Sequence, residues 1–82
     1  MLNLKIVSPE RIEFNGEIES IIVPGSQGQF EILVNHAPII SSLDKGTVVY
    51  TRPGGEKQSL DICGGFVEVQ KNQVSLCVEI KE

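Results

Sequence analysis

The 82-residue chain has few of the residues that nucleic-acid-binding proteins use. It contains three phenylalanines, one tyrosine and no tryptophan, and 11 acidic against 7 basic residues give a net charge of -4. Single-stranded nucleic acid is commonly held by stacked aromatic rings, and the phosphate backbone is held by positive charge. The composition therefore argues against nucleic acid as a partner.

Groups for catalysis and metal binding are equally scarce. His36 is the one histidine, and Cys63 and Cys77 are spaced as in no zinc motif. No G-x-x-x-x-G-K phosphate loop occurs in the sequence. Glu17 and Glu19 share a face of an expected strand, but exposed carboxylates of this kind are ordinary surface residues. We therefore predict a non-catalytic protein without a metal or a cofactor.

Signals for export and membrane insertion are also missing. Two cysteines are too few for a disulfide-stabilised domain, and the first residues, MLNLKIV, enter an alternating pattern without the features of a signal peptide. No apolar run approaches the ~20 residues that a membrane-spanning helix needs. We expect a reduced chain that is not itself inserted in a membrane, with Cys63 and Cys77 as small packing residues.

The chain is rich in β-branched residues, since 19 of its 82 residues are valine or isoleucine. These side chains lose freedom in helices and pack well on sheets. A chain of this length has room for one domain around one core. We therefore expect residues 1–82 to form a single β-domain, with no helical domain after it.

Alternation of apolar and polar residues predicts short extended segments throughout the chain, separated by glycine and proline. Asn15-Gly16 is expected to form a tight hairpin turn, because this dipeptide readily adopts positive φ angles. Further turns are expected at Asp44-Lys45-Gly46, Pro53-Gly54-Gly55 and Lys71-Asn72, and Gly64-Gly65 is expected to separate two strands, residues 57–62 and 66–69. The predicted fold is all-β, a small sandwich or flattened barrel of about eight to ten short strands.

His36 stands in an expected loop beside Ala37-Pro38. A loop histidine of this kind is compatible with local hydrogen bonding, and equally with recognition of a partner. The residues alone favour the local interpretation.

Four motifs occur in order along the chain and together carry a resemblance. They are Val23-Pro24-Gly25-Ser26-Gln27-Gly28, then Asn35-His36-Ala37-Pro38, then Leu43 with Gly46, then Gly64-Gly65-Phe66-Val67-Glu68-Val69. From Leu4 to about Val78 the sequence resembles the N-terminal β-sandwich domain of the epsilon subunit of rotary ATP synthases.

The resemblance implies a non-catalytic subunit of the central stalk, located at the cytoplasmic face of the bacterial inner membrane as a peripheral part of the complex. Such a subunit binds the gamma subunit and the membrane rotor ring of c subunits, and it couples proton-driven rotation to ATP synthesis. The positions that match the gamma contact are Ser8, His36, Ala37, Pro38 and Ser41. The positions that match the ring contact are Gly25, Ser26, Gln27, Gly28, Gln29, Phe30 and Glu31.

The sequence departs from the family pattern at several of these positions. Gln29 stands where an acidic residue is common, Glu31 where glycine is usual, and Val34-Asn35 where many members have proline-glycine. Most members also continue into a C-terminal helical hairpin that can restrain ATP hydrolysis, whereas this sequence ends at Glu82. We expect inhibition by such a hairpin to be absent.

Two alternatives remain beside this interpretation. A lipoyl- or biotinyl-type carrier domain is also a small acidic β-sandwich, and it presents a lysine at a hairpin turn, for which Lys45 is the candidate here. The other alternative is a β-sandwich that binds a different protein partner.

Overall fold

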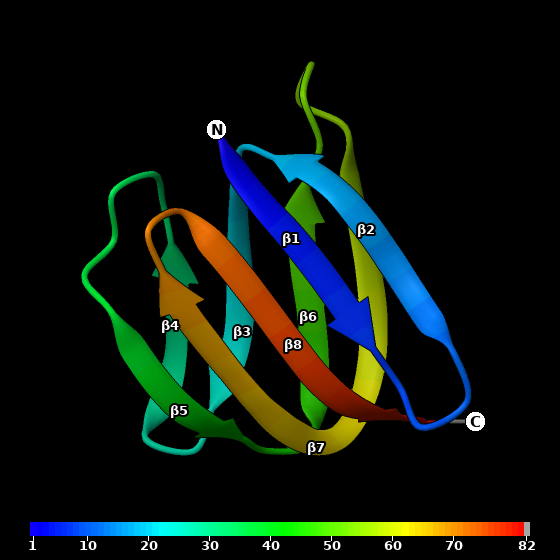
Figure 1. Cartoon of the computed structure of the whole chain (residues 1–82). Helices are drawn as coiled ribbons and strands as arrows, with labels where there is room; N and C mark the ends of the chain where they lie inside the picture. The colour runs from blue at the N-terminus through cyan, green and yellow to red at the C-terminus, as the bar shows by residue number, and fades with distance from the viewer. Residues whose placement is uncertain (82) are drawn as a thin grey trace.

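The computed structural model describes residues 1–81, and every regular element in that range is a β-strand. Figure 1 shows the eight strands. Their bounds are β1 Leu2–Val7, β2 Ile12–Ile18, β3 Ser20–Gly25, β4 Gly28–Ile32, β5 Ile39–Leu43, β6 Gly46–Thr51, β7 Lys57–Gln70 and β8 Gln73–Ile80. The all-β prediction is confirmed.

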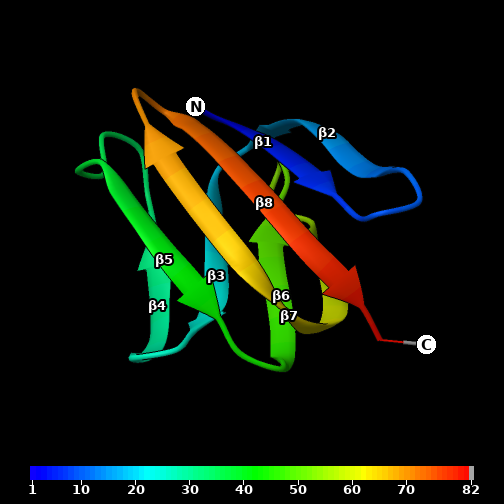
Figure 2. The ribbon, with the colours of Figure 1, turned by 60° about the horizontal axis from the view of Figure 1, so that its bottom comes forward.

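The strands form one continuous sheet that folds over on itself into two layers (Figures 1 and 2). The order is β2-β1-β8-β7-β5-β3-β4, and β6 joins β3 to β7. The first layer contains β2, β1, β8, the second half of β7, and β5; the second layer contains the first half of β7, β6, β3 and β4. Within this sheet β1 and β8 are parallel, and the other pairs are antiparallel. This arrangement is the flattened sandwich predicted from the sequence.

β7 passes from one layer into the other, and here the prediction of two separate strands is wrong. Residues 57–62 pair with β6, and residues 62–70 pair with β8. The register with β8 shifts between Ile62 and Gly64, and Gly65 adopts a φ of 149°. A Cβ atom on Gly65 would collide with the carbonyl oxygen of Cys77. The strand therefore bends at this register shift and at Gly65, and it continues through both glycines.

The prediction of a hairpin turn at Asn15-Gly16 is also wrong. Both residues lie inside β2, opposite Lys5 and Leu4 of β1. Gly16 faces inward on the same side as Phe14, and a Cβ atom there would lie 3.3 Å from the Phe14 ring. The missing side chain gives room to that ring, so Gly16 serves packing and not a turn. The chain reverses instead between β1 and β2, where the Ser8 amide donates to the carbonyl of Arg11 at 2.9 Å.

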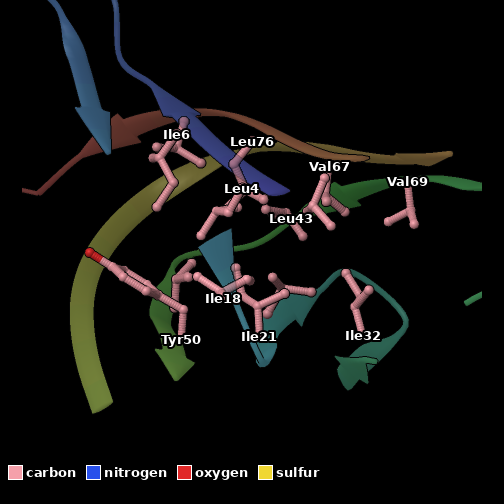
Figure 3. Close-up of a cluster of buried hydrophobic side chains, with 14 of the residues drawn as sticks. Leu4, Ile6, Ile18, Ile21, Ile32, Leu43, Tyr50, Val67, Val69 and Leu76 are labelled. Atoms are coloured by element: carbon pink, nitrogen blue, oxygen red, sulfur yellow. The ribbon is translucent and has the colours of Figure 1, made fainter. Parts of the chain in front are cut away.

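The core lies between the two layers and contains the apolar side chains that alternate along each strand (Figure 3). Leu4 and Ile6 of β1 and Leu76 of β8 face Ile21 of β3 across this space, and Ile18, the last residue of β2, lies beside Ile21. All five are at most 1% exposed. Burying a side chain of this size stabilises the fold by about 1.5–3 kcal/mol.

The two cysteines do not pack in this core. Both are free and exposed, which contradicts the prediction that they are packing residues. Cys77 lies between the buried Leu76 and Val78, so the alternation of β8 directs its side chain outward. Its position in the strand outweighs the general tendency of cysteine to be buried.

Candidate partner-binding surfaces

The loop that carries His36 joins β4 to β5. The His36 amide donates to the carbonyl of Leu33 at 3.1 Å, which closes a tight turn, and Asn35 has a φ of 67° in this turn. This backbone region suits glycine and tolerates asparagine, so Asn35 can adopt this conformation. His36 is half-buried, with Nδ1 2.7 Å from the Ala37 carbonyl oxygen, while Ala37 and Pro38 are exposed. Ala37 and Pro38 are therefore available to a partner.

Ser8 lies in the turn after β1, and its hydroxyl is used within the turn. The residue is only 5% exposed, and Oγ lies 2.9 Å from Oε2 of Glu13. Nε of Arg11 donates to the same carboxylate oxygen at 3.2 Å. The Ser8 hydrogen bond first, and then the Arg11 hydrogen bond, hold the pKa of Glu13 below its usual value of 4.5. A partner at this turn would meet the exposed Pro9 and Glu10 before Ser8.

The five residues predicted for the gamma contact do not form one cluster. Ser8 follows the end of β1, whereas His36 precedes the start of β5. Because β5 and β1 run in the same direction in the first layer, Ser8 and His36 lie at opposite ends of it and on different strands (Figure 1). Ser41 lies between them on β5, half-buried, and its hydroxyl donates to the Ser42 carbonyl at 3.1 Å. One partner can contact both Ser8 and His36 only by crossing this layer, and Ser41 shares the inward parity of Ile39 and Leu43 on β5.

The outward face of the first layer carries exposed apolar side chains for which the sequence predicted no partner contact. Val7, Cys77 and Phe66 are neighbours across β1, β8 and β7. Phe66 is 47% exposed, and Ile40 on β5 is 73% exposed. A shallow hollow of about 350 Å³ lies on this face, and it is lined by Val7, Ser8, Pro9, Gly65, Phe66, Cys77, Val78 and Glu79. We refer to Val7, Ile40, Phe66 and Cys77 as the outer apolar patch.

The signal for this patch was present in the sequence. In β7, Phe66 has the same parity as Glu68 and Gln70, whereas Val67 and Val69 have the buried parity. A period-2 strand directs residues of one parity to one face. An aromatic residue out of phase with the core positions is thus an indication of an apolar surface.

The segment predicted to contact the ring begins at the end of β3 and includes most of β4. Ser26, Gln27, Gly28, Gln29 and Glu31 are exposed, whereas Gly25 is buried and Phe30 is half-buried against the core. A Cβ atom on Gly25 would lie 2.7 Å from both the Gly28 carbonyl oxygen and the Phe30 ring. Gly25 and Phe30 therefore shape the segment, and the other five residues form its surface.

Hydrogen bonds fix the turn of this segment to the turn between β5 and β6. The Ser26 hydroxyl donates to Oδ1 of Asp44 at 3.0 Å, and the Ser42 hydroxyl donates to Oγ of Ser26 at 2.9 Å. The Ser26 amide also donates to the Ser42 carbonyl at 3.0 Å. These bonds give the exposed turn a defined position relative to β5.

Lys45 is exposed at the turn between β5 and β6, where the sequence predicted a turn. Within residues 1–81, no group of three histidine, cysteine, aspartate or glutamate side chains is placed to hold a metal ion. In the same range, no helix is long and apolar enough to cross a membrane.

Comparison with known proteins identifies the family. The model of the ATP synthase delta/epsilon chain β-sandwich domain matches residues 1–82. The ATP synthase epsilon chain of Leptospira borgpetersenii serovar Hardjo-bovis (strain JB197) is 44% identical over 78 residues, which are 95% of this chain and 61% of that protein. The epsilon chain of Gloeothece citriformis (strain PCC 7424) is 42% identical over 77 residues, 94% of this chain and 55% of that protein.

Two solved structures share the fold. One is a chain of the Euglena gracilis mitochondrial ATP synthase OSCP/F1/c-ring structure, with a TM-score of 0.89 and 22% identity over 94% of this chain and 49% of that one. The other is a chain of the Tetrahymena thermophila mitochondrial ATP synthase central stalk and c-ring, with a TM-score of 0.80 and 16% identity over 95% of this chain and 63% of that one. By its match to the family model and to these epsilon chains, the protein belongs to the ATP synthase delta/epsilon chain β-sandwich family.

Proposed function

We propose that this chain is a non-catalytic central-stalk subunit of a rotary ATP synthase, which binds the gamma subunit and the membrane rotor ring and helps to couple proton-driven rotation to ATP synthesis. Within the family, the observation that carries the proposal is the outer apolar patch on the first layer of the sandwich. The proposed location is the cytoplasmic face of the bacterial inner membrane, as a peripheral part of the complex.

The gamma contact is proposed to cover the outward face of the first layer. A partner that reaches both the Ser8 turn and the His36 loop has to lie across β1, β8, β7 and β5, and it would cover the outer apolar patch. Removing Phe66 and Ile40 from water would favour the complex, and a buried aromatic anchor often contributes a large share of binding energy. Ala37 and Pro38 would add contacts at one end of this surface.

The ring contact is proposed for the exposed residues of the Gly25–Glu31 segment. Their side chains are polar, with one carboxylate at Glu31, which suits hydrogen bonding to polar loops at a wet interface. The hydrogen bonds from Ser26 to Asp44 and Ser42 limit the movement of the turn, so less conformational entropy is lost on binding.

The family membership leaves the carrier-domain alternative without support. An exposed lysine at a turn is common in small β-domains, and the position of Lys45 alone indicates no modification. Mass spectrometry of the peptide that contains Lys45, taken from the native protein, is expected to show an unmodified lysine.

The test is a calorimetric titration of the purified chain with the gamma subunit of the same organism. Saturable one-to-one binding is expected, weakened by His36→Ala and by Ala37→Glu, because the second change places a charge in the contact. The same titration is made with Lys45→Ala, which lies outside the proposed gamma surface and should leave the affinity unchanged. Absence of binding by the unsubstituted chain would contradict the proposal.

A further inference from the structure

Two loops that are distant in the sequence are joined by a pair of asparagines. The Asn35 amide donates to Oδ1 of Asn72 at 2.7 Å, and Nδ2 of Asn72 donates to Oδ1 of Asn35 at 3.3 Å. Asn35 belongs to the loop between β4 and β5, and Asn72 to the turn between β7 and β8. The two connections lie side by side in both views (Figures 1 and 2).

Asn72 is itself held firmly. It forms a two-residue hairpin turn with Lys71, in which φ is 51° for Lys71 and 62° for Asn72, and the turn is closed by the Gln70 and Gln73 pair. Positive φ at both central residues is the geometry of a type I′ turn. The Asn72 carbonyl also accepts a hydrogen bond from the Asn3 amide of β1 at 2.9 Å. The backbone of Asn72 is thus held in place by β7, β8 and β1, which limits the positions open to its side chain.

The His36 loop has little else to fix it. Leu33 and Val34 are 52% and 45% exposed, so burial contributes little to its order. Its other hydrogen bonds, from the His36 amide to Leu33 and between His36 Nδ1 and Ala37, are local. For the loop residues 33–38 in the described part of the chain, the Asn35 and Asn72 pair supplies the hydrogen bonds to another element.

We propose that Asn72 is a positioning residue, which holds the His36 loop in the conformation that binds the gamma subunit by its reciprocal hydrogen bonds with Asn35. This inference rests on the proposed function, because it assigns the loop to the gamma contact. A loop that is ordered before binding loses less conformational entropy in the complex, so the pair increases affinity without touching the partner.

Glycine substitution separates the side-chain bonds from the backbone geometry. Asn72→Gly keeps the positive φ but removes the side-chain amide and with it both hydrogen bonds. Asn35→Gly also keeps the positive φ, but it removes only Oδ1 of Asn35, and its backbone amide can still donate to Asn72. Lys71→Gly is the matched control, because it changes the neighbouring residue of the same turn and leaves both asparagines in place. Asn72→Asp is the conservative variant, because a carboxylate still accepts the Asn35 amide.

The experiment combines amide hydrogen exchange by NMR, the melting temperature and titration with the gamma subunit. Asn72→Gly is expected to speed exchange of the Asn35 amide by about tenfold and to raise the Kd for gamma about threefold to tenfold, with a melting temperature close to that of Lys71→Gly. Asn72→Asp is expected to retain most of the affinity. The Asn35→Gly/Asn72→Gly double variant is expected to bind no more weakly than Asn72→Gly alone, because Asn72→Gly already removes both hydrogen bonds.

The outcomes separate this inference from the proposed function. Slow exchange of the Asn35 amide in Asn72→Gly, or fast exchange with an unchanged Kd for gamma, would overturn the inference while the unsubstituted chain still binds. An equal loss of affinity in Lys71→Gly would overturn it too, since a general effect of the turn would then suffice. Absence of gamma binding by the unsubstituted chain would overturn the proposed function, and with it the role of Asn72 in that contact.

Discussion

Phe66 and Cys77 face each other across β7 and β8, and both side chains point away from the core. Val7 lies on the other side of Cys77, on β1. Three apolar side chains thus form a row across the outward face of the first layer, where the alternation of each strand would otherwise place polar residues. This row lies at the Ser8 end of the proposed gamma contact, where Phe66 is opposite Ser42 near the end of β5. It determines which substitutions test that contact.

Replacing Phe66 by serine is expected to weaken binding to gamma by about tenfold or more, because a buried aromatic side chain in an interface is commonly worth over 1 kcal/mol. The fold should be retained, since Phe66 is already 47% exposed. Val49→Ser is the matched control, because Val49 is half-buried on the outward face of the second layer, on β6. Calorimetric titration measures both, and equal affinities for the two variants would contradict the proposed surface.

Cys77 offers a chemical test of the same surface. In a Cys63→Ser variant only Cys77 remains to react, and its exposed thiol is expected to react with a maleimide in the folded protein. Bound gamma should slow this reaction by at least about tenfold, because the thiol lies within the covered row. Labelling is followed by mass spectrometry with and without saturating gamma. An unchanged rate in the saturated complex would exclude Cys77 from the contact.

Gly65 and Gly64 are adjacent and are expected to respond very differently to alanine. Gly65 has a φ of 149°, and a Cβ atom there would lie 2.8 Å from Cα of Val78, so Gly65→Ala is expected to destabilise the fold by about 3 kcal/mol or more. At Gly64 a Cβ atom would approach the Leu43 carbonyl oxygen only to 3.5 Å, an ordinary contact. Gly64→Ala should therefore cost about 1 kcal/mol or less. Urea unfolding compares the two variants, and similar losses would show that the bend does not depend on Gly65.

The sequence was sufficient for the fold because period-2 alternation is a local property of each strand. Leu4 and Ile6 alternate with the polar Asn3 and Lys5 in the sequence, and their side chains lie in the core. The turn predicted at Asn15-Gly16 was wrong because the same dipeptide can also lie in an extended strand. Gly16 does so here, and its missing side chain leaves room for the Phe14 ring. The strand break predicted at Gly64-Gly65 was wrong for a similar reason. Glycine with positive φ also occurs where a strand is bent beside a bulge and continues.

The candidate surfaces were less accessible to sequence reasoning. The loop position of His36 followed from its neighbours, and the contact roles of His36 and Ser26 followed from the family resemblance. The hydrogen bonds of these loops, from Asn35 to Asn72 and from Ser26 to Asp44, join them to other strand connections. Such contacts depend on how distant segments meet, which a local pattern does not contain. The exposure of Phe66 could be predicted from its parity in the strand. The apolar row that it forms with Val7 and Cys77 depends on the pairing of three strands, which the sequence does not show.

Acid is expected to weaken the turn between β1 and β2 through Glu13. The hydrogen bonds from Ser8 and Arg11 keep the folded-state pKa of this carboxyl below 4.5, its usual value in an unfolded chain. The unfolded state therefore binds the proton more readily, and the contribution of Glu13 to stability is present above pH 4.5 and disappears as the pH falls through the folded-state pKa. Ser8→Ala removes the largest cause of the shift, so the pKa of Glu13 should rise toward its usual value.

NMR titration of the Glu13 carboxyl carbon measures that pKa directly, and urea unfolding at several pH values measures its effect on stability. Glu13→Gln should lessen the loss of stability in acid, because the titrating group is gone. Glu10→Gln, a change of an exposed carboxylate in the same turn, should leave the acid dependence close to that of the unsubstituted chain. If both variants lost stability in acid alike, the Ser8 and Glu13 hydrogen bond would contribute nothing to the acid sensitivity of the fold. Its role would then be limited to orienting the turn that precedes β2.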